Sequence, residues 1–154
     1  MSSVRGFAPI CFILALANAF GRVMTLLRVP QLMSEYLTTT FSSSFSILVA
    51  IVILFFLLGM FMDTGPAIVI MSPILLPALL KFGVDPIHFG VIMVANLAIG
   101  LVTPPFGLNL FVLAPMIDAP VLKVGHESIP FVAAFFIALL LITFIAPISL
   151  ILLG

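Results

Sequence analysis

The interruption at Gly100-Leu101-Val102-Thr103-Pro104-Pro105-Phe106-Gly107 divides one long apolar stretch of the sequence into two halves. The two adjacent prolines remove two backbone donors and exclude regular helix around them. At about 1.5 Å per residue, neither half (87–100 or 107–117) reaches across the roughly 30 Å of a bilayer core. Together they are long enough, so the sequence predicts one membrane crossing that is broken near its centre.

The composition places the rest of the chain in a membrane as well. Of the 154 residues, 64% are hydrophobic and only 6% are charged, and the mean hydropathy is +1.50. Soluble domains are about 45–50% apolar and about 25% charged. The formal net charge is zero, and no basic patch indicates a nucleic-acid partner. The lipid bilayer is therefore the expected surrounding of the apolar surface.

The other apolar stretches complete an all-α integral membrane protein. Residues 7–27 and 129–153 are long enough to be transmembrane helices. The stretch 28–43 is amphipathic and contains the helix breaker Pro30, so we predict an interfacial connector there. Residues 118–128 are predicted to be a polar loop before the last helix.

Residues 44–80 are predicted to form a helical hairpin with arms 44–62 and 66–80. If the hairpin enters and leaves on one side of the membrane, its tip lies near the midplane beside the broken helix. Asp63 would then be a functional candidate, because an intramembrane carboxylate is costly. If both arms span, Asp63 is only a helix cap, and the sequence leaves both possibilities open. The residues that mark the tip are Gly59, Asp63, Thr64, Gly65 and Pro66.

The broken helix is the candidate ion site. Irregular backbone inside a bilayer is tolerated only against protein or water, and secondary transporters bind Na⁺ with carbonyls exposed at such breaks. A hydrogen bond from Asn96, one turn earlier, would support the break. The alternative is a proline kink that neighbouring helices repair. The residues assigned to the break and its Na⁺ oxygens are Gly100, Val102, Thr103, Pro104, Pro105 and Gly107.

Enzymatic activity is not expected. Cys11 is the only cysteine and has no histidine at a spacing that could activate it. The sequence contains no glycine-rich phosphate loop and no paired carboxylates. We therefore expect no catalytic residues, no cofactor and no metal ion other than Na⁺ as a coupling ion.

Two segments resemble a known family. Gly-Met-Phe-Met-Asp-Thr-Gly-Pro opens the stretch 59–77, and Asn-Leu-Ala-Ile-Gly-Leu-Val-Thr-Pro-Pro-Phe-Gly lies within 83–112. Both are similar to the large permease subunit, DctM, of tripartite ATP-independent periplasmic (TRAP) transporters. The resemblance covers nearly the whole chain and corresponds to the C-terminal portion of that subunit, so the N-terminal half with the inverted partner repeat is expected as a missing partner.

The resemblance implies an elevator-type transporter in the bacterial inner membrane, of which this chain is half of an inverted repeat. It implies Na⁺-driven uptake of C4-dicarboxylate-like organic acids, a periplasmic binding protein (DctP-like) and a small membrane subunit (DctQ-like). In that layout 44–80 is a re-entrant hairpin, 87–117 is the broken helix and 28–43 is an arm. The implied Na⁺ site lies around Gly100 and Thr103, with Thr64 contributing from the hairpin tip.

Two other functions stay open from the sequence. One is a different carrier of the same ion-transporter superfamily. The other is a non-transporting membrane scaffold subunit, in which the prolines only kink helices. A break that water reaches favours transport, whereas a break sealed by lipid favours the scaffold.

Overall fold

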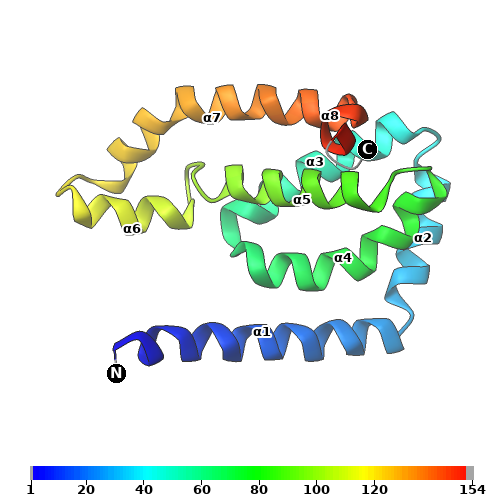
Figure 1. Ribbon diagram of the computed structural model, residues 1–154, viewed down its shortest axis with the longest axis horizontal. Coiled ribbons are helices and arrows are strands. Elements are labelled where there is room, and N and C mark those ends of the chain that lie inside the picture. The colour runs from blue at the N-terminus through cyan, green and yellow to red at the C-terminus, as the bar shows by residue number, and fades with distance from the viewer. Residues whose placement is uncertain (1, 152–154) are drawn as a thin grey trace.

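The computed structural model describes residues 2–151, and side chains from residue 11 onward. Within that range every regular element is a helix and none is a strand, which confirms the predicted all-α membrane fold. Among the described residues, three helices are long and apolar enough to cross a membrane, or four if one bent pair is counted as a single span. Most helices run along the long axis of the molecule (Figure 1).

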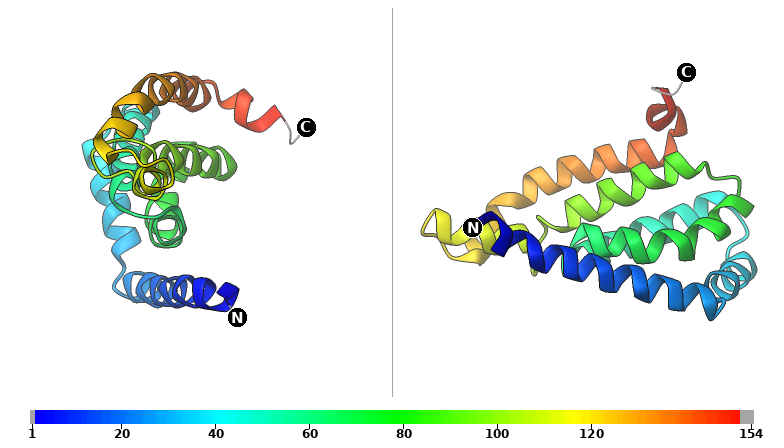
Figure 2. Two further views of the ribbon diagram at one scale, coloured as in Figure 1. Left: turned by 90° about the vertical axis from the view of Figure 1, so that its left-hand side faces the viewer. Right: turned by 60° about the horizontal axis from the view of Figure 1, so that its bottom comes forward.

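The first two helices meet at a sharp corner. α1 (Ser2–Leu26) and α2 (Val29–Thr40) form a bent pair with an angle of 67°. Arg28 occupies the left-handed region at φ 57°, and Pro30 lies in the first turn of α2. Proline favours a helix start and disfavours helix before it, which explains why α1 stops there. The stretch predicted as a connector is thus largely a helix that rises steeply from the end of α1 (Figure 2).

α3 (Ser44–Phe61) and α4 (Thr64–Lys81) form a tight helical hairpin. Only Met62 and Asp63 separate the two helices. The Asp63 carboxylate accepts a hydrogen bond from the Thr64 amide at 2.8 Å and so caps α4. At the other end, the Ser44 hydroxyl donates to the Phe82 carbonyl at 2.8 Å and closes the base of the hairpin.

The hydrophobic core lies between this hairpin and α5 (Pro86–Gly100). α3 packs along α5, while α1 and α2 both pack against α4. The fully buried side chains at the centre of the core include Phe55, Ile92 and Leu97. α5 is therefore enclosed by protein along one side, whereas α6 (Leu108–Met116) contributes only two buried residues.

The boundaries predicted for the last helix were wrong. We expected a polar loop over 118–128 and a helix over 129–153, but α7 covers Val121–Phe144 and a separate α8 covers Ala146–Leu150. The polar residues after Pro120 lie on the first two turns of α7. Pro147 cannot continue α7, because it lacks the amide that the Thr143 carbonyl would accept from. α8 accordingly turns away from the line of α7 (Figure 2).

A histidine compensates for this second break. His88, only 3% exposed, lies in the first turn of α5. Its Nε2 donates to the Thr143 carbonyl at 3.1 Å, and its Nδ1 is 2.8 Å from the Ser149 hydroxyl of α8. Because a carbonyl only accepts, Nε2 carries the proton and Ser149 donates to Nδ1 when the ring is neutral. The ring thus supplies the donor that Pro147 removes.

Candidate functional site

The hairpin tip lies against the end of α5. A Cβ added to Gly59 would come within 2.7 Å of the Leu97 carbonyl oxygen, and one added to Gly100 would come within 2.6 Å of the Gly59 backbone. Only glycine at both positions allows the two backbones to approach so closely. Figure 1 shows the tip level with the break after α5, while α1, α6 and α7 extend beyond it.

Two aromatic rings join the loops on either side of this crossing. The rings of Phe61, at the end of α3, and Phe106, in the break, have centroids 4.7 Å apart. Both side chains are largely exposed. An aromatic pair of this kind contributes stabilising free energy beyond that of the apolar area it buries. The tip and the break are therefore held together at two neighbouring points, the glycine crossing and the ring pair.

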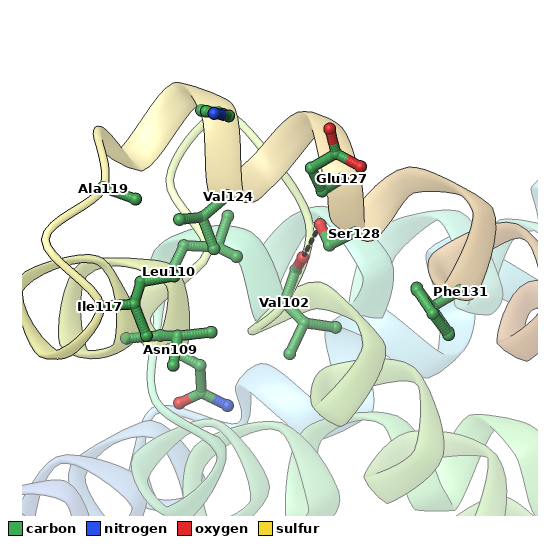
Figure 3. Close-up of a pocket in the computed structure, with 11 residues that line it drawn as sticks. Val102, Asn109, Leu110, Ile117, Ala119, Val124, Glu127, Ser128 and Phe131 are labelled. Atoms are coloured by element: carbon green, nitrogen blue, oxygen red, sulfur yellow. Dashed lines mark hydrogen bonds between the residues drawn. The ribbon is translucent and has the colours of Figure 1, made fainter.

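The backbone of the break is hydrogen-bonded within the chain. The amide of Thr103 donates to the Gly100 carbonyl at 3.0 Å, and the amide of Asn109 donates across the break to the Leu101 carbonyl at 3.1 Å. The single proton of the Ser128 hydroxyl of α7 is shared between the Gly125 carbonyl at 2.7 Å and the Val102 carbonyl at 3.2 Å (Figure 3). Each carbonyl has two lone pairs, so each of these candidate oxygens keeps one lone pair free of these bonds.

Gly107 closes the break on its far side. Its amide donates to the Thr103 carbonyl at 3.1 Å. A Cβ at this position would lie 2.8 Å from the Thr103 carbonyl oxygen and 2.9 Å from that of Leu101. The adjoining prolines differ in exposure, with Pro104 half-buried and Pro105 exposed. The chain therefore wraps tightly on itself between α5 and α6.

Thr103 has a local partner. Its buried hydroxyl donates to the Ile99 carbonyl, one turn earlier, at 2.7 Å. This bond is the one that a simple repair of the helix end requires. The hydroxyl oxygen nevertheless keeps its acceptor lone pairs, so the same side chain is able to add an oxygen ligand beside the break.

Asn96, next to the break, is a buried polar group without a partner among the described residues, as is the Ser34 hydroxyl of α2. Asn96 is 0% exposed, and among the described residues neither its Oδ1 nor its Nδ2 has a hydrogen-bond partner. A buried amide left in this state costs free energy, and it calls for an explanation such as strain, a bound water or an ion. Asn96 lies one turn before Gly100, so its unpaired amide group is next to the crossing of Gly59 and Gly100.

The rest of the tip is less closely tied to the break. Asp63 is exposed, while Thr64, Gly65 and Pro66 are half-buried. Gly65 lies beside α1, where a Cβ would be 3.4 Å from a Leu14 methyl. No hydrogen bond joins Thr64 to the break within the part of the chain that the structure describes. The structure thus brings Gly59 and Phe61 to the break, and Asp63 acts there as a helix cap.

Sequence reasoning missed Ser128, Asn109 and His88. Ser128 was assigned to a loop, although a hydroxyl in the first turns of a helix is a common donor to nearby carbonyls. Asn109 acts through its backbone amide, which no side-chain pattern reveals. A histidine two residues after the helix-start pair Asp85-Pro86 was a usable signal, since a buried histidine needs hydrogen-bond partners.

The described residues contain no cluster of side chains that could hold a metal ion by the usual His, Cys and carboxylate ligands. No group of three or more His, Cys, Asp or Glu side chains converges there. What the site offers is backbone carbonyls, one hydroxyl and one amide beside a broken helix. That arrangement, in an apolar multi-pass protein, is characteristic of secondary transporters rather than of enzymes.

The chain belongs to the DctM component family of tripartite ATP-independent periplasmic transporters, whose sequence pattern matches residues 1–148. It is 41% identical over 138 residues to the isethionate TRAP transporter permease protein DctMQ of Oleidesulfovibrio alaskensis, covering 90% of this chain and 22% of that protein. It is 36% identical over 139 residues to the C4-dicarboxylate TRAP transporter large permease protein DctM of Pseudomonas aeruginosa, covering 90% of this chain and 33% of that protein.

These matches confirm the resemblance found in the sequence and the expectation of a transporter permease instead of an enzyme. The chain spans about a fifth to a third of the length of these relatives. It is a multi-pass membrane protein of the TRAP large-permease family.

Proposed function

We propose that this chain forms part of the membrane pathway of a Na⁺-coupled TRAP transporter for organic acids of the C4-dicarboxylate type. In this proposal the substrate arrives from a DctP-like periplasmic binding protein. A DctQ-like small subunit and a further inverted repeat complete the carrier in the bacterial inner membrane. The names of the two relatives support an organic acid, with isethionate in one and C4-dicarboxylate in the other.

The observation that carries the proposal is the contact between Gly59 and Gly100. A hairpin whose tip meets a broken helix is the element pair from which inverted-repeat transporters build a site near the membrane midplane. The level of the tip in Figure 1 supports a re-entrant hairpin. The length of its arms, 18 residues each, also permits spanning, so the re-entrant topology is part of the proposal.

The groups at the break fit Na⁺. A hard cation favours oxygen ligands, and the carbonyls of Gly100, Leu101 and Val102 each keep a lone pair. Thr103 adds a hydroxyl and Asn96 an amide oxygen without a partner. In this proposal the cation is cargo that moves with the substrate, and these oxygens replace part of its water shell. Thr64 would contribute from the hairpin tip.

Uptake into proteoliposomes tests the proposal. The complete TRAP system that includes this chain is reconstituted with its binding protein, and uptake of radiolabelled C4-dicarboxylate is measured with Na⁺ or K⁺ outside. We expect uptake only with an inward Na⁺ gradient and with the binding protein present. Equal uptake in both salts would refute Na⁺ coupling, and no uptake of any organic acid would refute the transport proposal.

The scaffold alternative rests on a specific observation as well. Every candidate carbonyl of the break already accepts a hydrogen bond within the chain, which is what a repaired kink requires. The alternative predicts that substitutions at Thr103 and Asn96 alter stability alone. Measuring Na⁺ dependence and thermal stability on the same variants separates the two functions.

A further inference from the structure

A cavity of about 540 Å³ lies between α6 and the first turns of α7 (Figure 3). Its volume is within the range of about 300–1,000 Å³ typical of ligand sites. No residue of the hairpin lines it, so it is separate from the crossing of Gly59 and Gly100. Its walls are mainly apolar and include Leu110, Leu113, Ile117, Val124 and Phe131.

The cavity is a fixed part of the fold. A small cluster of Leu110, Ala114 and Val124 holds α6 against α7. Beside it, a Cβ on Gly125 would lie 2.9 Å from Pro104, so α7 also rests directly on the break. The hydrogen bond from Ser128 to the Val102 carbonyl adds a polar tie. α6 and α7 therefore meet near the break and near the turn that joins them, with the groove along their contact.

Two opposite charges line the mouth of the groove. Lys123 and Glu127 are one turn apart on α7, both are exposed, and both line the cavity. Lysine placed before glutamate is the weaker order for an ion pair along a helix. No salt bridge joins the two side chains in the structure of the described residues. Both charges are therefore available to a partner that carries one charge of each sign.

The position of the mouth relative to the membrane follows from the turn Ile117–Pro120. This polar turn contains Asp118 and lies at one end of the long axis, where α6 passes into α7 (Figure 1). Charged residues at the ends of apolar helices lie at the membrane–water boundary. The groove therefore begins at headgroup level and continues beside apolar side chains toward the break.

We infer that this groove binds a phospholipid whose headgroup carries both a phosphate and a primary ammonium, as in phosphatidylethanolamine. Lys123 pairs with the phosphate and Glu127 with the ammonium. One acyl chain occupies the apolar groove between α6 and α7. An anionic lipid without the ammonium would leave Glu127 facing negative charge. The pair of opposite charges at the mouth of the groove therefore favours the zwitterionic headgroup.

The sequence allows a clean optical test, because the chain contains no tryptophan. Phe131→Trp places a fluorophore in the groove. Ile129→Trp is the matched control, because it lies at a similar depth on another face of α7 and is 49% exposed. The full chain is reconstituted in phosphatidylcholine vesicles that contain a brominated-chain lipid with either an ethanolamine or a glycerol headgroup, and quenching is compared.

We expect the ethanolamine lipid to quench the groove tryptophan about threefold more effectively than the glycerol lipid, as two exposed charge pairs would produce. The control position should show equal quenching. Glu127→Gln should remove the preference, because only this residue meets the ammonium, and Lys123→Gln should weaken quenching by both lipids alike. Glu35→Gln, on α2, should leave both unchanged. Equal quenching at residue 131, a preference for the glycerol lipid, or a groove tryptophan that no lipid quenches because protein covers it would each overturn the inference.

Discussion

Gly59 of α3 and Gly100 of α5 touch backbone to backbone. The space that a Cβ on Gly100 would need is filled by the Gly59 carbonyl carbon and Cα, each 2.6 Å away, and by the Met60 amide at 2.9 Å. None of these atoms is the end of a flexible side chain that could move aside. The contact fixes where the hairpin tip meets the helix that breaks immediately afterwards.

Gly100→Ala should therefore destabilise the fold by roughly 1–3 kcal/mol, the usual cost of forcing extra volume into a packed contact. Gly90→Ala is the control on the same helix, because a Cβ there meets no atom within 4 Å. That substitution should stabilise by about 0.5–1 kcal/mol through helix propensity. Thermal unfolding in one detergent checks both variants. A Gly100→Ala protein as stable as the parent would show that the backbones do not touch as described.

Substitutions of Thr103 distinguish a role in Na⁺ binding from a role in capping the broken end of α5. Thr103→Val keeps the volume and removes both the bond to Ile99 and the hydroxyl oxygen. If the oxygen binds Na⁺, the half-saturating Na⁺ concentration for uptake should rise, and Thr103→Ser should retain much more function. The measurement is uptake against Na⁺ concentration in the complete transporter, with thermal stability recorded alongside. An unchanged Na⁺ curve for the valine variant would remove Thr103 from the site.

The topology of the hairpin is tested by accessibility. Single cysteines at Ala50, Thr64 and Lys81 are introduced on a Cys11→Ala background and treated with membrane-impermeant thiol reagents. A re-entrant hairpin predicts that Lys81 is labelled from the side at which the hairpin enters. The cysteine that replaces Thr64 should react slowly, because this position lies at the hairpin tip and is half-buried. Rapid labelling of Thr64 from the opposite side would mean that both arms span.

The role of His88 is tested by restoring what Pro147 removes. His88→Phe leaves the Thr143 carbonyl without its donor, which should cost about 1–3 kcal/mol of stability. Pro147→Ala returns an amide at the position that normally bonds to Thr143. In the double variant the effect of His88→Phe should be clearly smaller than in the parent, as a double-mutant cycle measures. Strictly additive effects would show that the histidine acts elsewhere.

The sequence predicted the main elements because apolar length and proline position are local signals. The double proline located the break after Gly100, and Asp63 with Pro66 located the start of α4. The end of α7 was missed because 129–153 is apolar throughout, and only the backbone requirement of Pro147 divides it. The bonds from Ser128 and Asn109 depend on residues that the fold brings together from different helices, and composition carries no information about those contacts.

The hydrogen bond from Ser128 to Val102 also bears on how the protein is made. The donor is 26 residues further along the chain than the carbonyl it satisfies. During synthesis the Val102 carbonyl therefore leaves the ribosome before Ser128 does, and it cannot receive this bond until the first turns of α7 have followed. Insertion of this region is thus expected to proceed with α5, α6 and α7 as one unit, since the break is complete only when all three are present.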